Sequence, residues 1–453
     1  MRRIEGRSNR ATLRIAVVVL ALAATAVVAP ASASAFSISS FILTPSTTQA
    51  AAHPNATISL SFSGGQVRDL TLDLPPGMIG NPETKTKCSQ AAFRADSCPG
   101  SSSVGTVKVT AAALGLLNLQ VPGSVYVLEP GAGDAATLGI VVRATGGLPI
   151  VGKIFSVAHF TAVRNSAGDY FLRSTITNLP NTATAVLGLV PVPLTIRQLT
   201  LSLKAAGNAP GTYFLTNPTS CDPANSAAQA VSYDNQTAGA QSSFTPTNCG
   251  AVPFQPSFAF QTSTSQAGAR TAPTVTITVP GNEDPLRQSH VRSVLLRFPP
   301  GLTLDILSAF GVPTCSDTAF AADSCAAGSR IGQVTVAVPP LPPDFTGDVY
   351  RVSPGPGDAY GFGVVLRGPR GLKALVRGGA SITSIQTSEG FLIQLVSSFP
   401  TLPQIPFTSF KLAITNPFFV NSATCGTRDG SASLGGWSGA SASLTAPYTT
   451  TGC

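Results

Sequence analysis

The chain has 453 residues, of which 11% are charged, and its formal net charge at pH 7 is +8. It contains 43 glycines and 37 prolines, a content that interrupts long helices and favours short strands joined by turns. Because no run of lysine or arginine follows the N-terminal segment, the composition excludes the usual footprint of a protein that binds nucleic acid or anionic lipid.

The first 35 residues have the order of a secretory signal peptide. Five arginines precede an uncharged run from Ile15 to Ala29, and small residues follow, ending at Ala35. This run is shorter than the ~18 to 20 apolar residues that a membrane span needs, and it leads into an A-x-A cleavage site. We therefore expect cleavage after Ala35 and a secreted or cell-surface protein with a formal charge of +4 and no transmembrane segment.

An internal repeat divides the mature chain into two homologous domains, residues 36–252 and 253–453. A fixed set of motifs occurs once in each half. The matching segments are Leu72–Gly77 with Leu296–Gly301, Cys88–Cys98 with Cys315–Cys325, Pro130–Asp134 with Pro354–Asp358, and Leu215–Pro218 with Ile414–Pro417. The offset between the copies varies, and the second copy has extra residues before Cys315. Insertions of this kind belong to surface loops, where the two domains can differ in their partners.

Eight cysteines form two sets of four with matching spacing. Equal separations in both copies select four local disulfides: Cys88 with Cys98, Cys221 with Cys249, Cys315 with Cys325, and Cys425 with Cys453. Metal binding is the alternative, but the sequence has no C-x-x-C motif and export favours oxidation. A bridge over ten residues excludes a continuous helix, so we expect a short helix capped by Ser89 or Ser316 that buries Phe93 or Phe320 and ends in a turn.

Strands with alternating apolar residues dominate the rest of each half. Those expected in the first copy are Val67–Leu74, Val104–Thr110, Gly123–Leu128, Thr137–Arg143 and Thr195–Lys204. Their counterparts are Val291–Phe298, Ile331–Val338, Asp348–Val352, Gly361–Arg367 and Ser409–Thr415. Short strands with frequent Gly and Pro turns predict an all-β protein made of two tandem antiparallel β-sandwich domains, jelly-roll or Ig-like, each with a disulfide-bounded helical loop.

Catalytic motifs are missing from the sequence. The three histidines, His53, His159 and His290, do not recur between the copies, and no nucleophile elbow, zinc-protease motif or phosphate-binding loop is present. Asp134 and Asp358 recur in P-G-x-G-D loops. A calcium or sugar ligand is one interpretation of this pair. The other, which we favour, is a turn in which Asp binds the backbone, because hard cations need several oxygen ligands.

One string carries a family resemblance. Leu74-Pro-Pro-Gly-Met-Ile-Gly-Asn-Pro82, with the serine-rich segment after Cys98 and the Val125–Pro130 segment, resembles secreted actinobacterial-type repeat proteins of unknown function. The resemblance covers most of the first copy and, more loosely, the second, which lacks Gly-Asn-Pro. It implies export and β-rich repeats, and it supplies no catalytic residues.

These observations favour a non-enzymatic structural or binding protein, secreted or at the cell surface, that needs no cofactor. A carbohydrate-binding or adhesive module is one alternative, with a cell-wall glycan or another surface protein as partner. It would be supported by Tyr126, Tyr350 and Tyr360 exposed on one face of a sheet. An enzyme with an unrecognised site is the other alternative, and a deep pocket that gathers carboxylates from distant strands would support it.

Overall fold

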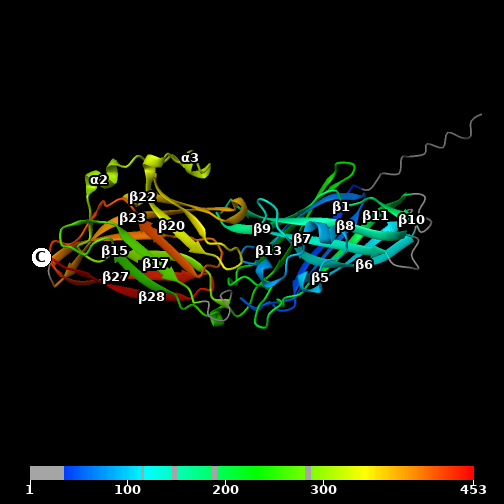
Figure 1. Ribbon diagram of the computed structural model, residues 1–453, viewed down its shortest axis with the longest axis horizontal. Coiled ribbons are helices and arrows are strands. Elements are labelled where there is room, and N and C mark those ends of the chain that lie inside the picture. Colours follow the sequence, from blue (N-terminus) through cyan, green and yellow to red (C-terminus); the bar gives the residue numbers. More distant parts are fainter. Residues whose placement is uncertain are drawn as a thin grey trace, which may run out of the picture.

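The computed structural model describes residues 35–113, 117–144, 150–166, 168–185, 191–280, 287–388 and 390–453. Residues 1–34 of the expected signal peptide therefore lie outside the described residues. Two β-rich domains lie one after the other along the long axis of the molecule, the first running from blue to green in Figure 1 and the second from green to red. The expected fold class, two tandem antiparallel β-sandwich domains with disulfide-bounded helical loops, is confirmed.

The first domain is built mainly from one large antiparallel sheet. Its strands are β1 (Ser37–Pro45), β2 (Ala56–Ser63), β3 (Val67–Asp73), β5 (Ser103–Ala113), β6 (Leu117–Leu128), β7 (Ala136–Ala144), β8 (Ile150–Arg164), β9 (Tyr170–Ile176), β10 (Thr182–Ala185), β11 (Pro191–Leu203), β13 (Ala224–Ser232) and β14 (Thr237–Phe244). The strand order is β1-β2-β11-β5-β6-β7-β8-β9-β3-β13-β14, with β10 beside β11 and β8. Its two edge strands, β1 and β14, contact each other, so the sheet curls round a single core.

The second domain repeats this architecture. Its strands are β15 (Ser257–Thr262), β17 (Pro273–Thr278), β18 (Val291–Arg297), β20 (Arg330–Ala337), β21 (Phe345–Val352), β22 (Tyr360–Arg367), β23 (Lys373–Thr387), β24 (Gly390–Phe399), β25 (Ser409–Ile414), β27 (Gly426–Gly436) and β28 (Ser441–Thr450). The order β15-β17-β25-β20-β21-β22-β23-β24-β18-β27-β28 matches the first domain strand for strand. Each domain adds a small sheet, β4 (Ile79–Gly80) with β12 (Leu215–Thr216), and β16 (Arg270–Thr271) with β26 (Phe419–Val420) and β19 (Thr303–Leu304).

Helices are few and short. They are α1 (Gln90–Arg94), α2 (Ile306–Gly311) and α3 (Asp317–Ala321), and the 3-10 turns η1 (Pro82–Thr84), η2 (Gly100–Ser102), η3 (Cys249–Ala251), η5 (Ala327–Ser329) and η6 (Pro369–Gly371). The side chains of Ser89 and Ser316 cap α1 and α3 by accepting a backbone N–H, as the sequence predicts. Helix α2 follows β19 as the turn η1 follows β4 in the first domain, in a segment where the second copy is three residues longer before Cys315.

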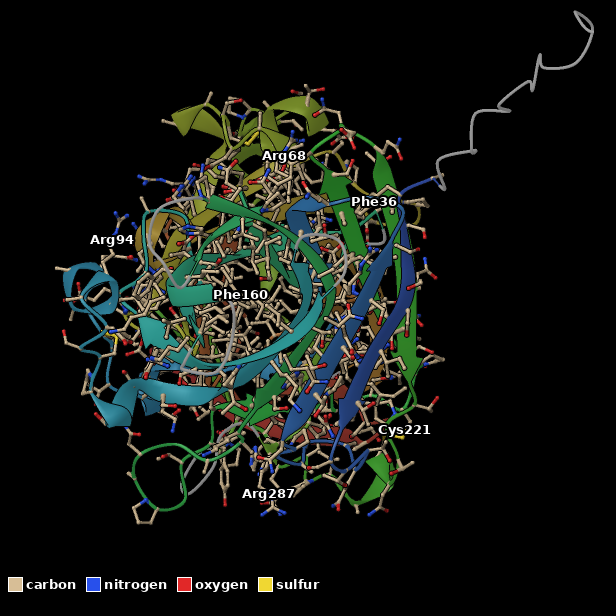
Figure 2. All side chains as sticks on the ribbon, turned by 90° about the vertical axis from the view of Figure 1, so that its right-hand side faces the viewer. Phe36, Arg68, Arg94, Phe160, Cys221 and Arg287 are labelled. Carbon is tan, nitrogen blue, oxygen red and sulfur yellow. A yellow bond between two sulfur atoms is a disulfide. The ribbon has the colours of Figure 1, made fainter. Side chains whose placement is uncertain are left out.

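Alternation of apolar and polar residues explains which face of each strand is buried. In β11, Leu199, Leu201 and Leu203 are buried, while the polar residues between them are only partly covered. Figure 2 looks along the long axis from the first domain and shows its strands wrapped round an interior filled with side chains, Phe160 among them. This period-two pattern is what places an apolar face inward on each strand.

One detail of the repeat alignment is wrong. The sequence pairs Leu215–Pro218 with Ile414–Pro417, but Asn217 is equivalent to Asn421. The side-chain amide of Asn217 donates to the carbonyls of Thr47 and Gln49, at 2.8 and 2.9 Å. The amide of Asn421 donates to the carbonyls of Thr264 and Gln266 at the same two distances. The Thr-Asn-Pro triplet of the second copy instead follows β25, so its recurrence does not mark the structural equivalent.

Candidate binding surface

The eight cysteines lie in four bridges, and no described cysteine is free. The bridged pairs are those that the spacing selects: Cys88–Cys98, Cys221–Cys249, Cys315–Cys325 and Cys425–Cys453, with Cα–Cα distances of 5.5, 5.9, 5.4 and 5.8 Å. The two bridges that span ten residues, Cys88–Cys98 and Cys315–Cys325, hold α1 and α3 against the outer face of the sheet. There the ring of Phe93 lies on Gly139, where an added Cβ would come within 2.6 Å of the ring, and Phe320 lies on Gly363 in the same way.

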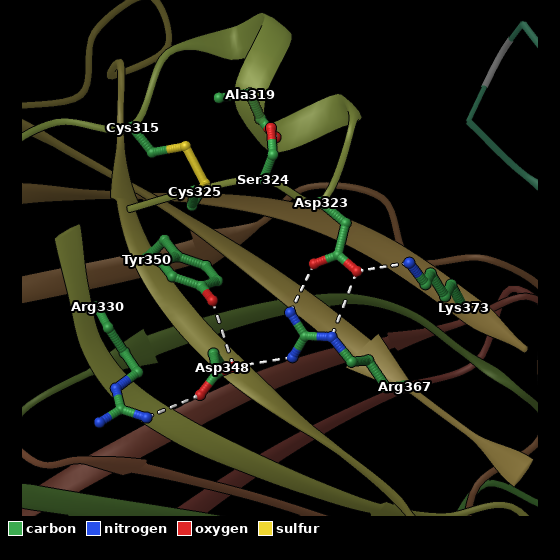
Figure 3. A network of polar contacts seen from close by, with 10 residues as sticks. All are labelled: Cys315, Ala319, Asp323, Ser324, Cys325, Arg330, Asp348, Tyr350, Arg367 and Lys373. Carbon is green, nitrogen blue, oxygen red and sulfur yellow. Dashed lines mark hydrogen bonds and ion pairs between the residues drawn. A yellow bond between two sulfur atoms is a disulfide. The ribbon is translucent and has the colours of Figure 1, made fainter. Parts of the chain in front are cut away.

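A network of charges fastens the α3 loop to the sheet beneath it (Figure 3). The carboxylate of Asp323, at the turn after α3, accepts from Arg367 at 2.6 Å and from Lys373 at 2.7 Å. Arg367 also donates to Asp348, 2.8 Å away. Although partial burial opposes it, these cationic partners lower the pKa of Asp323.

The first domain carries the same arrangement. Asp96 accepts from Arg143 and, at 2.8 Å, from Lys153, and these hydrogen bonds lower its pKa to about 2. Both Asp96 and Asp323 adopt a φ of 54°, a left-handed turn conformation that aspartate tolerates better than most residues. These two aspartates therefore recur because each holds a disulfide-bounded loop to the sheet. Their carboxylates are bound by the arginine and lysine of the sheet.

Asp134 and Asp358 both lie in tight turns. Their backbone N–H groups donate to the carbonyls of Gly131 and Gly355, at 3.2 and 3.1 Å. The side chain of Asp134 also accepts from Thr137 at 2.8 Å and contacts Nδ1 of His159 at 2.7 Å, a pairing that the sequence did not predict. Within the described part of the chain, no three His, Cys, Asp or Glu side chains gather as metal ligands.

The other two histidines have separate environments. His53 stacks on Tyr213 with a centroid distance of 3.9 Å, and its Nδ1 lies 3.0 Å from the hydroxyl of Thr216. His290 is 3% exposed, and burial lowers its pKa to about 4. No contact among those described joins a serine, threonine or cysteine to a histidine–carboxylate pair as nucleophilic catalysis requires: His159 has a carboxylate, but the hydroxyl of Thr137 donates to that same carboxylate.

Tyr126, Tyr350 and Tyr360 do not form an exposed aromatic face. Tyr350 and Tyr360 are each 7% exposed, and the half-buried Tyr126 packs against the α1 loop. Burial raises the pKa of Tyr360 to about 12. The particular support that these residues could have given to a carbohydrate-binding module is therefore missing.

A polar groove of about 460 Å³ runs along the side of the first domain and reaches Gln404 of the second. Carboxylates and amides line it, including Asp73, Asp222, Asn225 and Gln241. Asp73 already binds Arg173, at 2.6 and 2.8 Å, and Asp222 accepts from Ser220 at 2.7 Å. Both carboxylates of the groove are thus held by neighbouring side chains.

The junction between the domains is a packed interface. The hydroxyl of Tyr170, at the start of β9, accepts the backbone N–H of Leu375 at 2.9 Å, and its ring belongs to the core cluster of the second domain. Arg370, with a φ of 57°, donates to the carbonyls of Asp134 and Ala135 at 2.7 and 3.1 Å. Such contacts join the two domains more tightly than a flexible linker would.

The opposite end of the second domain, remote from the first, is uncovered and apolar. Seven large apolar side chains are exposed among the described residues, and six of them lie at this end: Ile306, Leu307 and Phe310 on α2, and Ile382, Phe391 and Ile393 on β23 and β24. Leu307 is 87% exposed and Phe391 80%. We call these six residues the free-end patch. Figure 1 shows α2 near the end of the molecule that carries the C-terminus.

Short contacts connect the two halves of the free-end patch. Gly301, just before β19, donates its N–H to the carbonyl of Ile393 at 2.9 Å, and α2 follows β19 directly. The hydroxyl of Tyr360 donates to the carbonyl of Ala309 on α2, and Phe310 packs edge-on against the Tyr360 ring at 5.6 Å. Helix α2 therefore follows β19, which lies next to β24, and contacts Tyr360 at the start of β22.

No protein-family model matches the chain, and no curated protein matches it in sequence. Among solved structures it is similar to the type II cohesin dyad from the adaptor ScaA scaffoldin of Acetivibrio cellulolyticus, at 8% identity over 90% of this chain and 95% of that one, with a TM-score of 0.16. A tetra-tandem repeat from the extending region of a large adhesion protein aligns at 10% identity over 91% and 99% of the two chains, with a TM-score of 0.12. TM-scores this low carry no argument about function.

Proposed function

We propose that the chain is an exported, non-enzymatic binding protein whose working surface is the free-end patch of its second domain. The observation that carries the proposal is that six of the seven exposed large apolar side chains in the described part of the chain lie at one end of the second domain. The side chains of Leu307 and Phe391 are 87% and 80% exposed, so their apolar area lies in contact with water. Burial of that area against a partner is favourable.

Export is part of the proposal. Two observations support it: four disulfides, which form and persist in oxidising compartments, and the signal-like order of residues 1–35. Among the described residues no helix is both long and apolar enough to cross a bilayer.

Site-specific crosslinking tests the binding surface. A photoreactive side chain placed at Leu307 in the exported chain should form adducts on intact cells or with the secreted material. The same group at Ile42, which is 52% exposed on β1 and lies outside the patch, provides the matched control. Adducts at 307 and none at 42 support the proposal, whereas equal labelling or no adduct at either position would overturn it.

Glycan binding in the polar groove is a second candidate function. It is favoured by the side-chain amides of Asn225 and Gln241, which line the groove near the junction and offer donors and acceptors of the kind that sugar hydroxyls need. Binding of the exported chain to a cell-wall glycan array, lost in the N225A/Q241A double variant and kept in the L307S/F391S double variant, would assign the groove. Binding that survives the change in the groove would reject it.

A further inference from the structure

We infer that the junction of the two domains holds a small-molecule site whose ligand is an uncharged amphiphile. Its apolar tail lies in a cavity between the domains, and its hydroxyl-bearing head lies in the polar groove beside that cavity. The site is separate from the free-end patch. For the groove it rests on the glycan-binding candidate above, to which it adds the requirement for an apolar tail.

The apolar part of the site is a cavity of about 120 Å³ at the junction. Inward-facing residues of the curled sheet of the first domain line it, among them Leu138 of β7 and Phe160 of β8. Loops of the second domain that carry Leu341 and Ile405 line its other side. Domain interfaces are a common place for ligand cavities, because two surfaces there enclose a space that neither domain encloses alone.

The wall of this cavity has one buried polar atom with nothing to bind. Its side chains are apolar apart from Tyr170, whose hydroxyl accepts the N–H of Leu375, and Gln404. Gln404 is 8% exposed, and its Oε1 is buried with no hydrogen-bond partner among the described residues. That oxygen lies against Gly77 of the wall, where an added Cβ would come within 2.5 Å of it. Since buried polar atoms are normally paired, this acceptor points to a ligand that supplies a donor.

The orientation of the Gln404 amide is set by the first domain. Its backbone N–H donates to Oδ1 of Asp169 at 2.9 Å, and its Nε2 lies 3.4 Å from Oδ2 of the same carboxylate. A carboxylate accepts hydrogen bonds and donates none, so the nitrogen of the amide faces Asp169 and the oxygen faces Gly77. The unpaired acceptor is therefore held in place from across the junction.

The polar groove adjoins the cavity. Three residues, Leu74, Phe171 and Gln404, line both spaces. The amide of Gln404 thus lies at the boundary between an apolar space and a polar one. A ligand with its tail in the cavity would place its first hydroxyl near Oε1 and its remaining polar atoms in the groove.

The lining of the groove determines which head group fits. The described residues that line it include carboxylates, amides and hydroxyls but no lysine, arginine or histidine. An anionic head would therefore lose its hydration without gaining a cation. The carboxylates of Asp73 and Asp222 are held by neighbouring side chains, while the amides of Asn225 and Gln241 offer donors and acceptors. An uncharged head rich in hydroxyls, such as a sugar, matches this set.

The volume of the cavity limits the tail. An engineered apolar cavity of about 150 Å³ binds benzene. A cavity of about 120 Å³ should therefore take an unbranched tail of about five carbon atoms. Each methylene that enters should raise the affinity about fourfold, and methylenes beyond the cavity should add little. Affinity that levels off with chain length is thus the signature of this site.

Isothermal titration calorimetry of the exported chain with alkyl β-glucosides, each below its critical micelle concentration, tests the site. The affinity should rise from methyl to pentyl glucoside and then level off. Pentyl sulfate should bind about tenfold more weakly than pentyl glucoside, because its charge meets no cation. No binding, an affinity that keeps rising with chain length, or a sulfate that binds as tightly as the glucoside would overturn the assignment.

Two glutamine variants test the acceptor. Q404M removes the unpaired oxygen and keeps the length of the side chain, so it should weaken pentyl glucoside binding about tenfold, the effect of one hydrogen bond. Gln394 provides the matched control, because it is also 8% exposed but its Nε2 donates to the carbonyl of Phe298 at 3.1 Å. Q394M should leave the affinity unchanged and lower the melting temperature more than Q404M does. The reverse pattern would give Gln404 a role in folding alone and would overturn the inference.

A third variant separates the tail from the head. A136L places a larger side chain in the cavity, since Ala136 of β7 lines it. It should abolish the gain from methyl to pentyl glucoside and keep the affinity for methyl glucoside, and a gain that survives would reject the cavity. If the wild-type chain binds both glucosides equally, glycan binding in the groove stands and the amphiphile fails. Neither result bears on crosslinking at Leu307, which reports the free-end patch.

Discussion

At the scale of single residues, His290 is a titratable group whose buried environment differs strongly from that of a free side chain. It lies at the start of the second domain, and its backbone N–H donates to Thr219 of the first. Burial lowers the pKa of its ring to about 4, and the nearby backbone of Gln404 offsets only part of this shift. The folded protein therefore holds the ring neutral at a pH where the unfolded chain, with a pKa of about 6.5, binds a proton.

The free energy of unfolding should fall as the pH falls below the pKa of a free histidine. Above about pH 6.5 the ring is neutral in both states and contributes no pH dependence. As the pH falls from about 6.5 to 4, the unfolded state gains a proton that the folded state does not, so the free energy of unfolding should fall by about 3 kcal/mol in total. Urea denaturation between pH 7.5 and 4.5 measures this slope. The H290L variant should lose it, and an equal slope in both proteins would contradict the assignment.

The burial of His290 could not be predicted from the sequence. The residue follows a segment in which the two copies differ, so no repeated pattern places it on a strand face. Asp96 and Asp323 show the opposite case, since their recurrence after the capped helices predicted a turn. The structure adds the reason why the charge recurs in both copies, namely the arginine and lysine that bind each carboxylate.

At the scale of elements, the docking of the disulfide-bounded loops depends on two glycines. A methyl group at Gly139 would reach within 2.6 Å of Phe93, and Gly363 is in the same position beneath Phe320. Gly139→Ala should therefore push the α1 loop off the sheet and lower the free energy of unfolding by about 1 to 3 kcal/mol, the usual effect of overpacking. Gly239→Ala in β14 is the matched control, because its nearest contact would be 3.7 Å away. Chemical denaturation of both variants checks the difference, and equal losses would reject the packing argument.

The disulfide pairing gives a second prediction at this scale. Peptide mapping of the unreduced exported chain should recover Cys88 with Cys98 and Cys315 with Cys325 as separate short crosslinks, together with the two bridges that span twenty-eight residues. The physical reason is that a local pair closes a short loop within one domain, so its partner is always the nearer thiol. A peptide that joins Cys88 to a cysteine of the second domain would contradict it.

Five strands of each domain were predictable because alternation and turn residues are local signals. β3, β7, β18 and β22 lie within a residue or two of the expected ranges. What the sequence did not predict depends on contacts between distant segments. The free-end patch is an example: extra residues before Cys315 were visible, but no repeated pattern placed Leu307 and Phe391 at the same end of the domain. One signal was the apolar content of Ile306–Phe310, since the matching segment of the first copy, residues 82–87, is polar.

At the scale of the whole molecule, the junction determines whether the two domains behave as one unit. Tyr170 belongs by sequence to the first domain but by packing to the core of the second, and Arg370 makes the reverse contact. Interfaces of this kind transmit stability, since unfolding one domain exposes apolar area on the other. A calorimetric scan of the wild-type chain should therefore show one cooperative transition.

Removing the Tyr170 side chain should separate the two halves. Y170A deletes a buried ring and its hydrogen bond from Leu375, a change that costs about 3 to 5 kcal/mol for a large aromatic residue, and the scan should then resolve into two transitions. I393A changes the equivalent position of the second domain, where Ile393 is 46% exposed, and should leave a single transition near the wild-type temperature. If both variants split the transition, the junction is not what couples the domains.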